Sequence, residues 1–201
     1  MSAYNIVLAG IGGQGILLVA NVIGAAAVAD GLNVRVGGIH GMAQRGGAVV
    51  STVRVGEGVL APFVLEGEAD VLLGFEVLET VRNLRYASER TLVITNSESI
   101  VLSEFSARQP DCPSLKGLVE KIRLFTSRIV VVEAADLAKA AGSRLAQNSV
   151  LLGTLAAVKG FPVKQKSILE ALAELVPKKH VEVNVRAFDL GRKKMREFTQ
   201  V

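Results

Sequence analysis

The feature that most restricts the fold is a continuous apolar run that leads directly into a glycine-rich loop. The run Asn5-Ile-Val-Leu-Ala9 is typical of a strand buried on both faces of a parallel sheet. The loop 10–15 follows, and apolar residues then recur at helical spacing from Gln14 to about Asp30, where Gly31 ends the helix. A strand, a glycine loop and a helix in this order predict the first unit of an α/β fold.

The rest of the chain continues this alternation of strands and helices. Strands are expected at 33–36, 48–55, 70–75, 91–95 and 129–133. Helices are expected at 77–86, 135–141, 150–158, 164–175 and from 180 onward, and the proline-containing segment 96–114 is expected to be irregular. The pattern predicts a single domain over residues 1–201 with an open, mainly parallel Rossmann-like sheet flanked by helices. Ligands of such sheets bind outside the carboxyl ends of the strands, where the glycine loop lies.

Composition and charge exclude several classes of protein. The longest apolar run, 16–29, is interrupted by Asn21 and Gly24 and is shorter than the roughly 20 residues that cross a bilayer. The N-terminus lacks the features of a secretory signal, so we expect a cytoplasmic protein with no membrane partner. The net charge is +4, and the basic residues after His180 are expected to form a solvated helical face rather than a nucleic-acid site.

The chain has too few metal-binding residues to hold a redox centre alone. It contains one cysteine, Cys112, and two histidines, His40 and His180. One thiol supplies neither a disulfide nor the ligands of an iron–sulfur cluster or a zinc site. The spacing of the histidines also gives no Ser-His-Asp arrangement. We therefore expect this chain to hold no cofactor by itself.

The glycine loop matches the pattern G-x-G-x-x-G at the position where that pattern binds phosphates. Its glycines allow a tight turn and a close approach of backbone N–H groups to an anion at a helix N-terminus. Against a dinucleotide, the second strand is expected to end in Val36-Gly-Gly, where NAD proteins carry an acidic residue, and Asp30 precedes that strand. A stand-alone dinucleotide-binding protein and a turn without any ligand remain alternatives. The candidate binding residues of this loop are Gly10, Gly12, Gly13, Gln14 and Gly15.

A second polar loop, 39–47, lies between two predicted strands. Its sequence is Ile39-His40-Gly-Met-Ala-Gln44-Arg45-Gly46-Gly47. Arg45 is suited to bind a carboxylate or phosphate through two hydrogen bonds, and His40 is suited to donate one. His40 and Arg45 are therefore candidate catalytic residues, and Gln44, Arg45 and Gly46 are candidate binding residues. The alternative is that these groups bond only to neighbouring loops, as we also expect for Asn148 and Asn184.

The two loops together resemble a known family. The segments 10–15 and His40-Gly-Met-Ala-Gln-Arg-Gly-Gly-Ala-Val-Val-Ser51 are similar to the gamma-type domain of 2-oxoacid:ferredoxin oxidoreductases. The form of the second segment is most similar to the indolepyruvate:ferredoxin oxidoreductases, in which the corresponding chain is the beta subunit. Segments 66–70, 148–153 and 181–184 agree with this resemblance, which covers nearly the whole chain.

The resemblance implies a small subunit that is active only inside a complex. Such a complex decarboxylates an indolepyruvate, another arylpyruvate or a related 2-oxoacid, forms an acyl-CoA and passes electrons to ferredoxin. Thiamine diphosphate, Mg and the iron–sulfur clusters are then expected in a larger partner subunit, with coenzyme A as co-substrate. Gly12, Gly13 and Gln14 would approach coenzyme A or the partner, and Arg45 would counter an anionic group. The remaining alternative is an interaction scaffold without chemistry.

Overall fold

One six-stranded sheet organises the computed structural model, which describes residues 3–40, 46–98 and 114–199. The strand order across the sheet is β2-β3-β1-β4-β5-β6. The strands are β1 (Tyr4–Ile11), β2 (Val34–His40), β3 (Ala48–Val55), β4 (Val71–Gly74), β5 (Leu92–Asn96) and β6 (Ile129–Val132).

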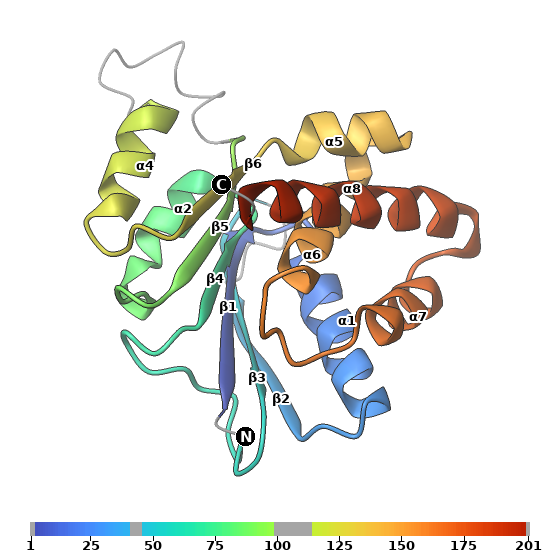
Figure 1. The fold of residues 1–201 in the computed structure, drawn as a ribbon, viewed down its shortest axis with the longest axis horizontal. Helices are drawn as coiled ribbons and strands as arrows, with labels where there is room; N and C mark the ends of the chain where they lie inside the picture. Colours follow the sequence, from blue (N-terminus) through green and yellow to red (C-terminus); the bar gives the residue numbers. More distant parts are fainter. Residues whose placement is uncertain (1–2, 41–45, 99–113, 200–201) are drawn as a thin grey trace.

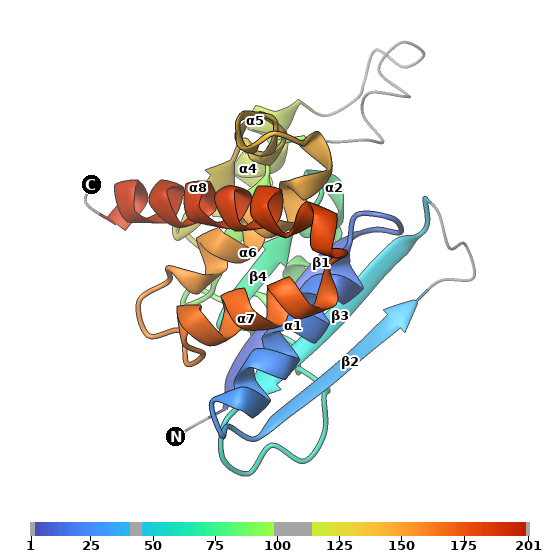
Figure 2. The same cartoon turned by 90° about the vertical axis from the view of Figure 1, so that its right-hand side faces the viewer.

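The sheet is parallel on one side of β1 and antiparallel on the other. β1, β4, β5 and β6 pair in parallel, with Ile6 opposite Val71 and Val71 opposite Leu92. β3 pairs antiparallel with both β1 and β2, so β2 and β3 form a long hairpin that extends the parallel sheet. Figure 2 shows β2 as the outermost strand of this extension.

Helices cover the two faces of the sheet unequally (Figure 1). The helices α1, α5, α6, α7 and α8 lie on one face, whereas α2 and α4 lie on the other. Their bounds are α1 (Ile16–Ala29), α2 (Val77–Arg82), α4 (Leu115–Arg123), α5 (Ala134–Ala141), α6 (Gln147–Ala156), α7 (Gln165–Leu175) and α8 (Val181–Thr199). Short 3₁₀ turns occur at η1 (Leu84–Tyr86), η2 (Arg144–Ala146) and η3 (Lys178–His180).

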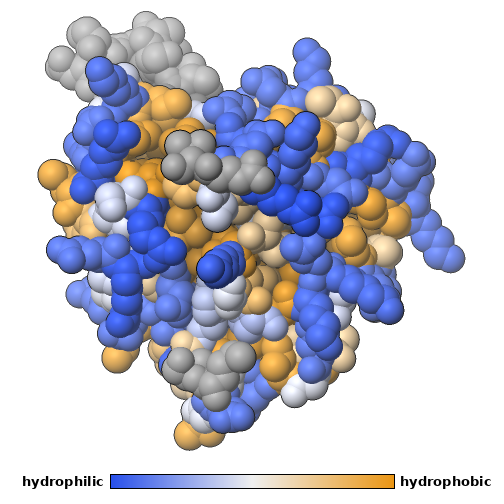
Figure 3. Space-filling view, in the orientation of Figure 1, coloured by the Kyte–Doolittle hydropathy of each residue, from blue (hydrophilic) through white to orange (hydrophobic). Residues whose placement is uncertain are grey.

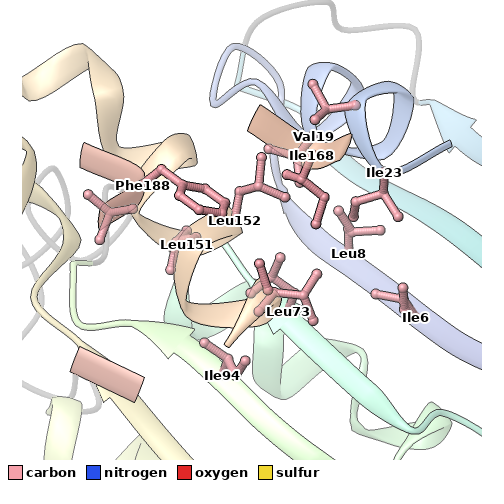
Figure 4. Close-up of a cluster of buried hydrophobic side chains, with 14 of the residues drawn as sticks. Ile6, Leu8, Val19, Ile23, Leu73, Ile94, Leu151, Leu152, Ile168 and Phe188 are labelled. Carbon is pink, nitrogen blue, oxygen red and sulfur yellow. The ribbon is translucent and has the colours of Figure 1, made fainter. Parts of the chain in front are cut away.

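The larger core lies between the sheet and the first group of helices. Figure 4 shows Leu8 and Leu73 pointing from the strands toward helix residues such as Leu152, and all three are fully buried. α6 is buried along nearly its whole length because the sheet and α8 enclose it. Alternate residues of β1, such as Val7, enter the smaller core under α2 and α4. The carboxyl ends of β1, β4 and β5 are thereby brought to one edge of the molecule.

The structure confirms the predicted fold class and most of its elements, with three differences. The second strand continues to His40 rather than ending at Val36, because its residues 37–40 pair with β3. β2 and β3 are antiparallel, so the sheet is mixed although its centre is parallel. Helix α4 was not predicted, although Ser114 accepts a hydrogen bond from the N–H of Gly117 and so caps it. No helix in the described part of the chain is long and apolar enough to cross a membrane.

Candidate functional site

The glycine loop forms a sharp turn between β1 and α1. Gly13 and Gly15 have φ angles of 101° and 79°, in the left-handed region that favours glycine. Gly15 is the N-cap of α1, and no side chain caps this helix. The N–H groups of Gly13 and Gly15 donate to no described residue. The loop therefore presents backbone donors at a helix N-terminus.

The side chain of Gln14 holds this loop in place. Its Oε1 accepts a hydrogen bond of 2.8 Å from the N–H of Ile11, and its Nε2 donates to the carbonyl of Phe75 over 3.2 Å. The same Oε1 lies 2.6 Å from the place where a Cβ at Gly10 would stand. Gly10 therefore leaves the space that Gln14 occupies, and Gln14 links the end of β1 to the end of β4.

The two loops singled out in the sequence are joined by backbone hydrogen bonds. The N–H of Gly12 donates to the carbonyl of Gly47 over 2.8 Å, and the N–H of Gly46 donates to the carbonyl of Gly12 over 3.4 Å. The predicted residues Gln44 and Arg45 lie outside the described residues. His40 is described only as the last backbone position of β2. The structure thus places the carboxyl end of the second loop, Gly46 and Gly47, beside the first.

A cleft of about 240 Å³ opens at the carboxyl edge of the sheet, beside the glycine loop. Gly13 and Gln14 form one wall of the cleft. Phe75, which follows β4, and Asn96, which ends β5, also line it. The opposite wall comes from η2 and the start of α6. Its lining residues there are Arg144, Leu145, Gln147, Asn148 and Leu151, with Glu98 beyond β5. This is the edge at which open α/β sheets bind ligands.

Carboxamide side chains connect the walls of the cleft. Asn96 is almost fully buried, and its Nδ2 lies 3.2 Å from the Phe75 carbonyl and 3.0 Å from Gln147 Oε1. Gln14 donates to the same carbonyl. The ends of β1, β4 and β5 and the start of α6 are therefore tied together at the Phe75 carbonyl. Neither Asn96 nor Gln147 was predicted, although a polar residue at the end of a buried strand is a signal that could have found Asn96.

Asn148 and Asn184 were both expected to make structural hydrogen bonds, but Asn148 lies at the cleft and Asn184 lies between two helices. Asn148 lines the cleft, and its Nδ2 would lie 2.4 Å from a Cβ at Gly15, so the glycine lets α6 approach the loop. Asn184 accepts a hydrogen bond of 2.6 Å from the Ser149 hydroxyl and donates to the His180 carbonyl. Asn184 therefore links α6 to α8, as expected.

The charges at the cleft are paired across its rim. Arg144 of η2 donates to the carboxylate of Glu98.

The strand next to β1 on the hairpin side is the antiparallel β3, and it begins at Ala48 opposite Ile11. The acidic residue that contacts the ribose in NAD proteins has no counterpart there. Within residues 3–40, 46–98 and 114–199, no three His, Cys, Asp or Glu residues lie together as a metal site.

Comparisons with known proteins agree on one family. The family model described as "Pyruvate ferredoxin/flavodoxin oxidoreductase" matches residues 5–194. The chain is 42% identical over 200 residues to "Indolepyruvate oxidoreductase subunit IorB" of Thermococcus kodakarensis, covering 98% of both chains. A keto/oxoacid ferredoxin oxidoreductase gamma subunit from Geobacter sulfurreducens has the same fold, with TM-score 0.69 and 24% identity over 96% of this chain and 99% of that one.

A longer chain contains the same fold as one of its parts. The 2-oxoglutarate:ferredoxin oxidoreductase from Magnetococcus marinus was solved with 2-oxoglutarate, coenzyme A and succinyl-CoA bound. The alignment covers 98% of the present chain and 32% of that chain, with TM-score 0.71 and 20% identity. This architecture therefore occurs both as a separate chain and inside a larger one.

Proposed function

We infer that this chain, which belongs to the pyruvate ferredoxin/flavodoxin oxidoreductase family, is the small subunit of a 2-oxoacid:ferredoxin oxidoreductase. The observation that carries this conclusion is the 42% identity to an indolepyruvate oxidoreductase subunit over 98% of both chains. The enzyme activity belongs to the complex, and the isolated chain is inactive. Its substrate is indolepyruvate or another arylpyruvate, which is oxidatively decarboxylated to an acyl-CoA.

The proposal divides the chemistry between two subunits. The larger partner holds thiamine diphosphate, Mg and the iron–sulfur clusters, which supply the decarboxylation and pass electrons to ferredoxin. This division is supported by the single cysteine of the chain, because one thiol cannot supply the ligands of an iron–sulfur cluster. The small subunit works in the cytoplasm and contributes the glycine-loop edge of its sheet to the shared active site.

The glycine loop and the second loop have complementary tasks in this proposal. The N–H groups of Gly13 and Gly15 face an anionic group of coenzyme A or the backbone of the partner. Arg45 neutralises a phosphate or carboxylate through two hydrogen bonds, and His40 and Gln44 donate to the same ligand. The hydrogen bonds of Gly12 with Gly46 and Gly47 support this joint role, because they hold both loops at one place.

The role of Arg45 is tested in the reconstituted complex. Arg45→Ala should raise the KM for coenzyme A roughly tenfold or more, because a charge-assisted contact to a phosphate is lost. Arg123→Ala, which removes an exposed arginine from α4, is the control and should leave the KM unchanged. An unchanged KM in Arg45→Ala would show that the second loop serves assembly alone.

The substrate class is tested with the same complex. Coenzyme A-dependent ferredoxin reduction should be fastest with indolepyruvate or phenylpyruvate and slower with pyruvate and branched-chain 2-oxoacids. A preference for pyruvate would place the chain in the family but contradict the arylpyruvate assignment.

A further inference from the structure

In the described part of the chain, no helix covers the outer face of the β2–β3 hairpin, unlike the rest of the sheet. On β3, Val49, Val53 and Val55 are buried toward α1, whereas the alternate residues Thr52 and Arg54 face the other side. Within the described residues, the irregular segment between β3 and β4 crosses this outer face, whereas α2 and α4 lie over the other strands of the sheet (Figures 1 and 2). In that part of the chain, no helix covers the outer face of the hairpin.

The segment that crosses this face is held in a fixed position. Thr52 Oγ1 donates a hydrogen bond of 2.7 Å to the Pro62 carbonyl, and Arg54 Nη1 donates to the Ala61 carbonyl over 3.1 Å. Asn33 Nδ2 donates to the Val59 carbonyl over 3.1 Å, and the side chain of Val64 is buried in the smaller core. Side chains that point outward from this segment are thus presented by an ordered backbone.

Three large apolar side chains point outward from it. Leu60, Phe63 and Leu65 are 85%, 74% and 72% exposed, and together they form what we call the apolar ridge. A hollow of about 70 Å³ lies against Phe63, with Gly37, Val50 and Tyr86 among its walls. Figure 3 shows one face of the molecule, on which apolar residues reach the surface between hydrophilic ones. An ordered group of exposed apolar residues beside a hollow marks a protein interaction surface.

The charges around the ridge indicate the kind of partner. Arg35, Arg54 and Arg85 flank it, and none of them has a carboxylate within ion-pair distance in the described part of the chain. The stretch 60–65 itself carries no charge, and the exposed Glu57 and Glu66 lie on either side of it in the chain. The surface is therefore apolar at its centre, and the exposed Arg35 and Arg85 lie at its margin without a carboxylate partner among the described residues. Carboxylates on a different subunit would complement these arginines.

We propose that the apolar ridge and the outer face of the β2–β3 hairpin are the surface on which the larger subunit docks. This inference rests on the proposed function. The same hairpin reaches Gly46 and Gly47, which are hydrogen-bonded to Gly12, so docking along its outer face would bring the partner to the glycine-loop edge of the sheet. The partner offers an apolar pocket for Phe63, surrounded by carboxylates for Arg35 and Arg85.

The experiment co-expresses the tagged chain with the larger subunit and measures the dissociation constant of the purified pair. Phe63→Asp should weaken association by roughly 30-fold or more, as expected for a central aromatic contact. Arg35→Glu should weaken it less and reduce its dependence on salt concentration. The matched control is Leu124→Asp, because Leu124 is 83% exposed but follows α4 at the opposite end of the sheet. It should bind like wild type.

Each outcome separates this inference from the proposed function. Thermal unfolding of isolated Phe63→Asp should match wild type because the side chain is exposed, so that lost binding is not lost folding. If wild type binds the larger subunit and Phe63→Asp binds equally well, the docking surface is wrong although the function stands. If Phe63→Asp instead abolishes a dimer of this chain and leaves partner binding intact, the ridge joins two copies and the inference is overturned. A wild-type chain that does not bind the larger subunit overturns the proposed function and the docking surface together.

Discussion

Gly15 joins the glycine loop to α1 in a backbone conformation that other residues rarely adopt. Its φ angle is 79°, and a Cβ there would lie 2.4 Å from Asn148 Nδ2. Gly15→Ala should therefore lower the free energy of unfolding by about 1–3 kcal/mol, through backbone strain and displacement of the asparagine. Denaturant unfolding measures this change. The double variant with Asn148→Ala should recover the steric part, and equal losses with and without Asn148 would contradict the contact.

Gln14 is a second residue whose role depends on its neighbours. Gln14→Ala removes the acceptor for the Ile11 N–H and a donor to the Phe75 carbonyl, so unfolding should become easier by about 1–3 kcal/mol. Gln14→Glu keeps the acceptor but places a carboxylate oxygen against a carbonyl oxygen. It should therefore not restore the stability of the wild type. Thermal denaturation of both variants tests this, and full recovery in Gln14→Glu would show that the contact to Phe75 is unimportant.

For individual residues, the sequence predicted where the glycine loop lies but not the hydrogen bonds that its neighbouring side chains make. The left-handed glycines at the loop were predictable because strand, loop and helix adjoin in the chain. The partners of Gln14 and Asn96 were not, because both side chains bond to Phe75, which lies 61 and 21 residues away, respectively. Such contacts depend on the order of strands in the sheet, which local pattern does not specify.

The backbones of helices α6 and α8 pack so closely that two glycines at their contact leave no room for a Cβ. A Cβ at Gly153 would lie 1.9 Å from the carbonyl oxygen of Phe188, and one at Gly191 would lie 1.9 Å from that of Val150. Gly153→Ala should therefore separate the helices and reduce the free energy of unfolding by several kcal/mol, in the range of roughly 2–4. Chemical denaturation provides the measurement.

A glycine elsewhere in the same protein provides the control for this prediction. Gly117 lies inside α4, and a Cβ there would meet only Ser114 Oγ, at 3.5 Å. Gly117→Ala should be neutral or should stabilise the protein by about 0.4–1 kcal/mol, because alanine favours the helix. If both substitutions had the same effect, close packing of α6 on α8 would not be the cause.

Asp30 connects the end of α1 to the start of α7. Its carboxylate accepts hydrogen bonds of 2.7 Å from the Lys164 N–H and 2.6 Å from the Ser167 hydroxyl. Burial alone would raise the pKa of this carboxyl, but the bonds from Ser167 and Lys164 outweigh it and the pKa lies below its ordinary value of 3.8. The charged form is thus favoured in the folded protein.

This pKa shift sets the direction of a pH dependence. Stability from Asp30 is fully present above the unfolded pKa and is lost as pH falls through the lowered folded pKa. Asp30→Asn should destabilise by about 1–2 kcal/mol near neutral pH, and the difference from wild type should shrink below about pH 4. Unfolding measured from pH 3 to pH 7 tests it. A difference that stays constant or grows toward low pH would assign the effect to something other than the charge.

At the scale of elements, long periodic segments were predictable and their arrangement was only partly so. The helices near the two ends of the chain, α1, α7 and α8, lie close to where the sequence predicted them. The antiparallel insertion of β3 between β1 and β2 was not predicted, because strand direction depends on connection geometry rather than on the residues of the strand. α4 was missed because its buried side consists of few residues, chiefly Leu118 and Ile122.

In the described residues, helices cover one face of the sheet and part of the other, and the cleft lies at the carboxyl edge of the strands. Composition and the two loop motifs predicted both the fold class and the family. The apolar ridge was not predicted, because Leu60, Phe63 and Leu65 become a surface only when the outer face of the hairpin lacks a helix. The chain is a subunit of an oxidoreductase, and the enzyme activity is carried by the complex.

In the function proposed here, the chain works only as part of a larger enzyme. The most direct measurement is the rate of coenzyme A-dependent ferredoxin reduction with indolepyruvate, for the larger subunit alone, for this chain alone and for the two together. We predict activity for the reconstituted pair and none for this chain by itself, with at least roughly a 100-fold gain over the larger subunit alone. Equal activity of the larger subunit with and without this chain would contradict it.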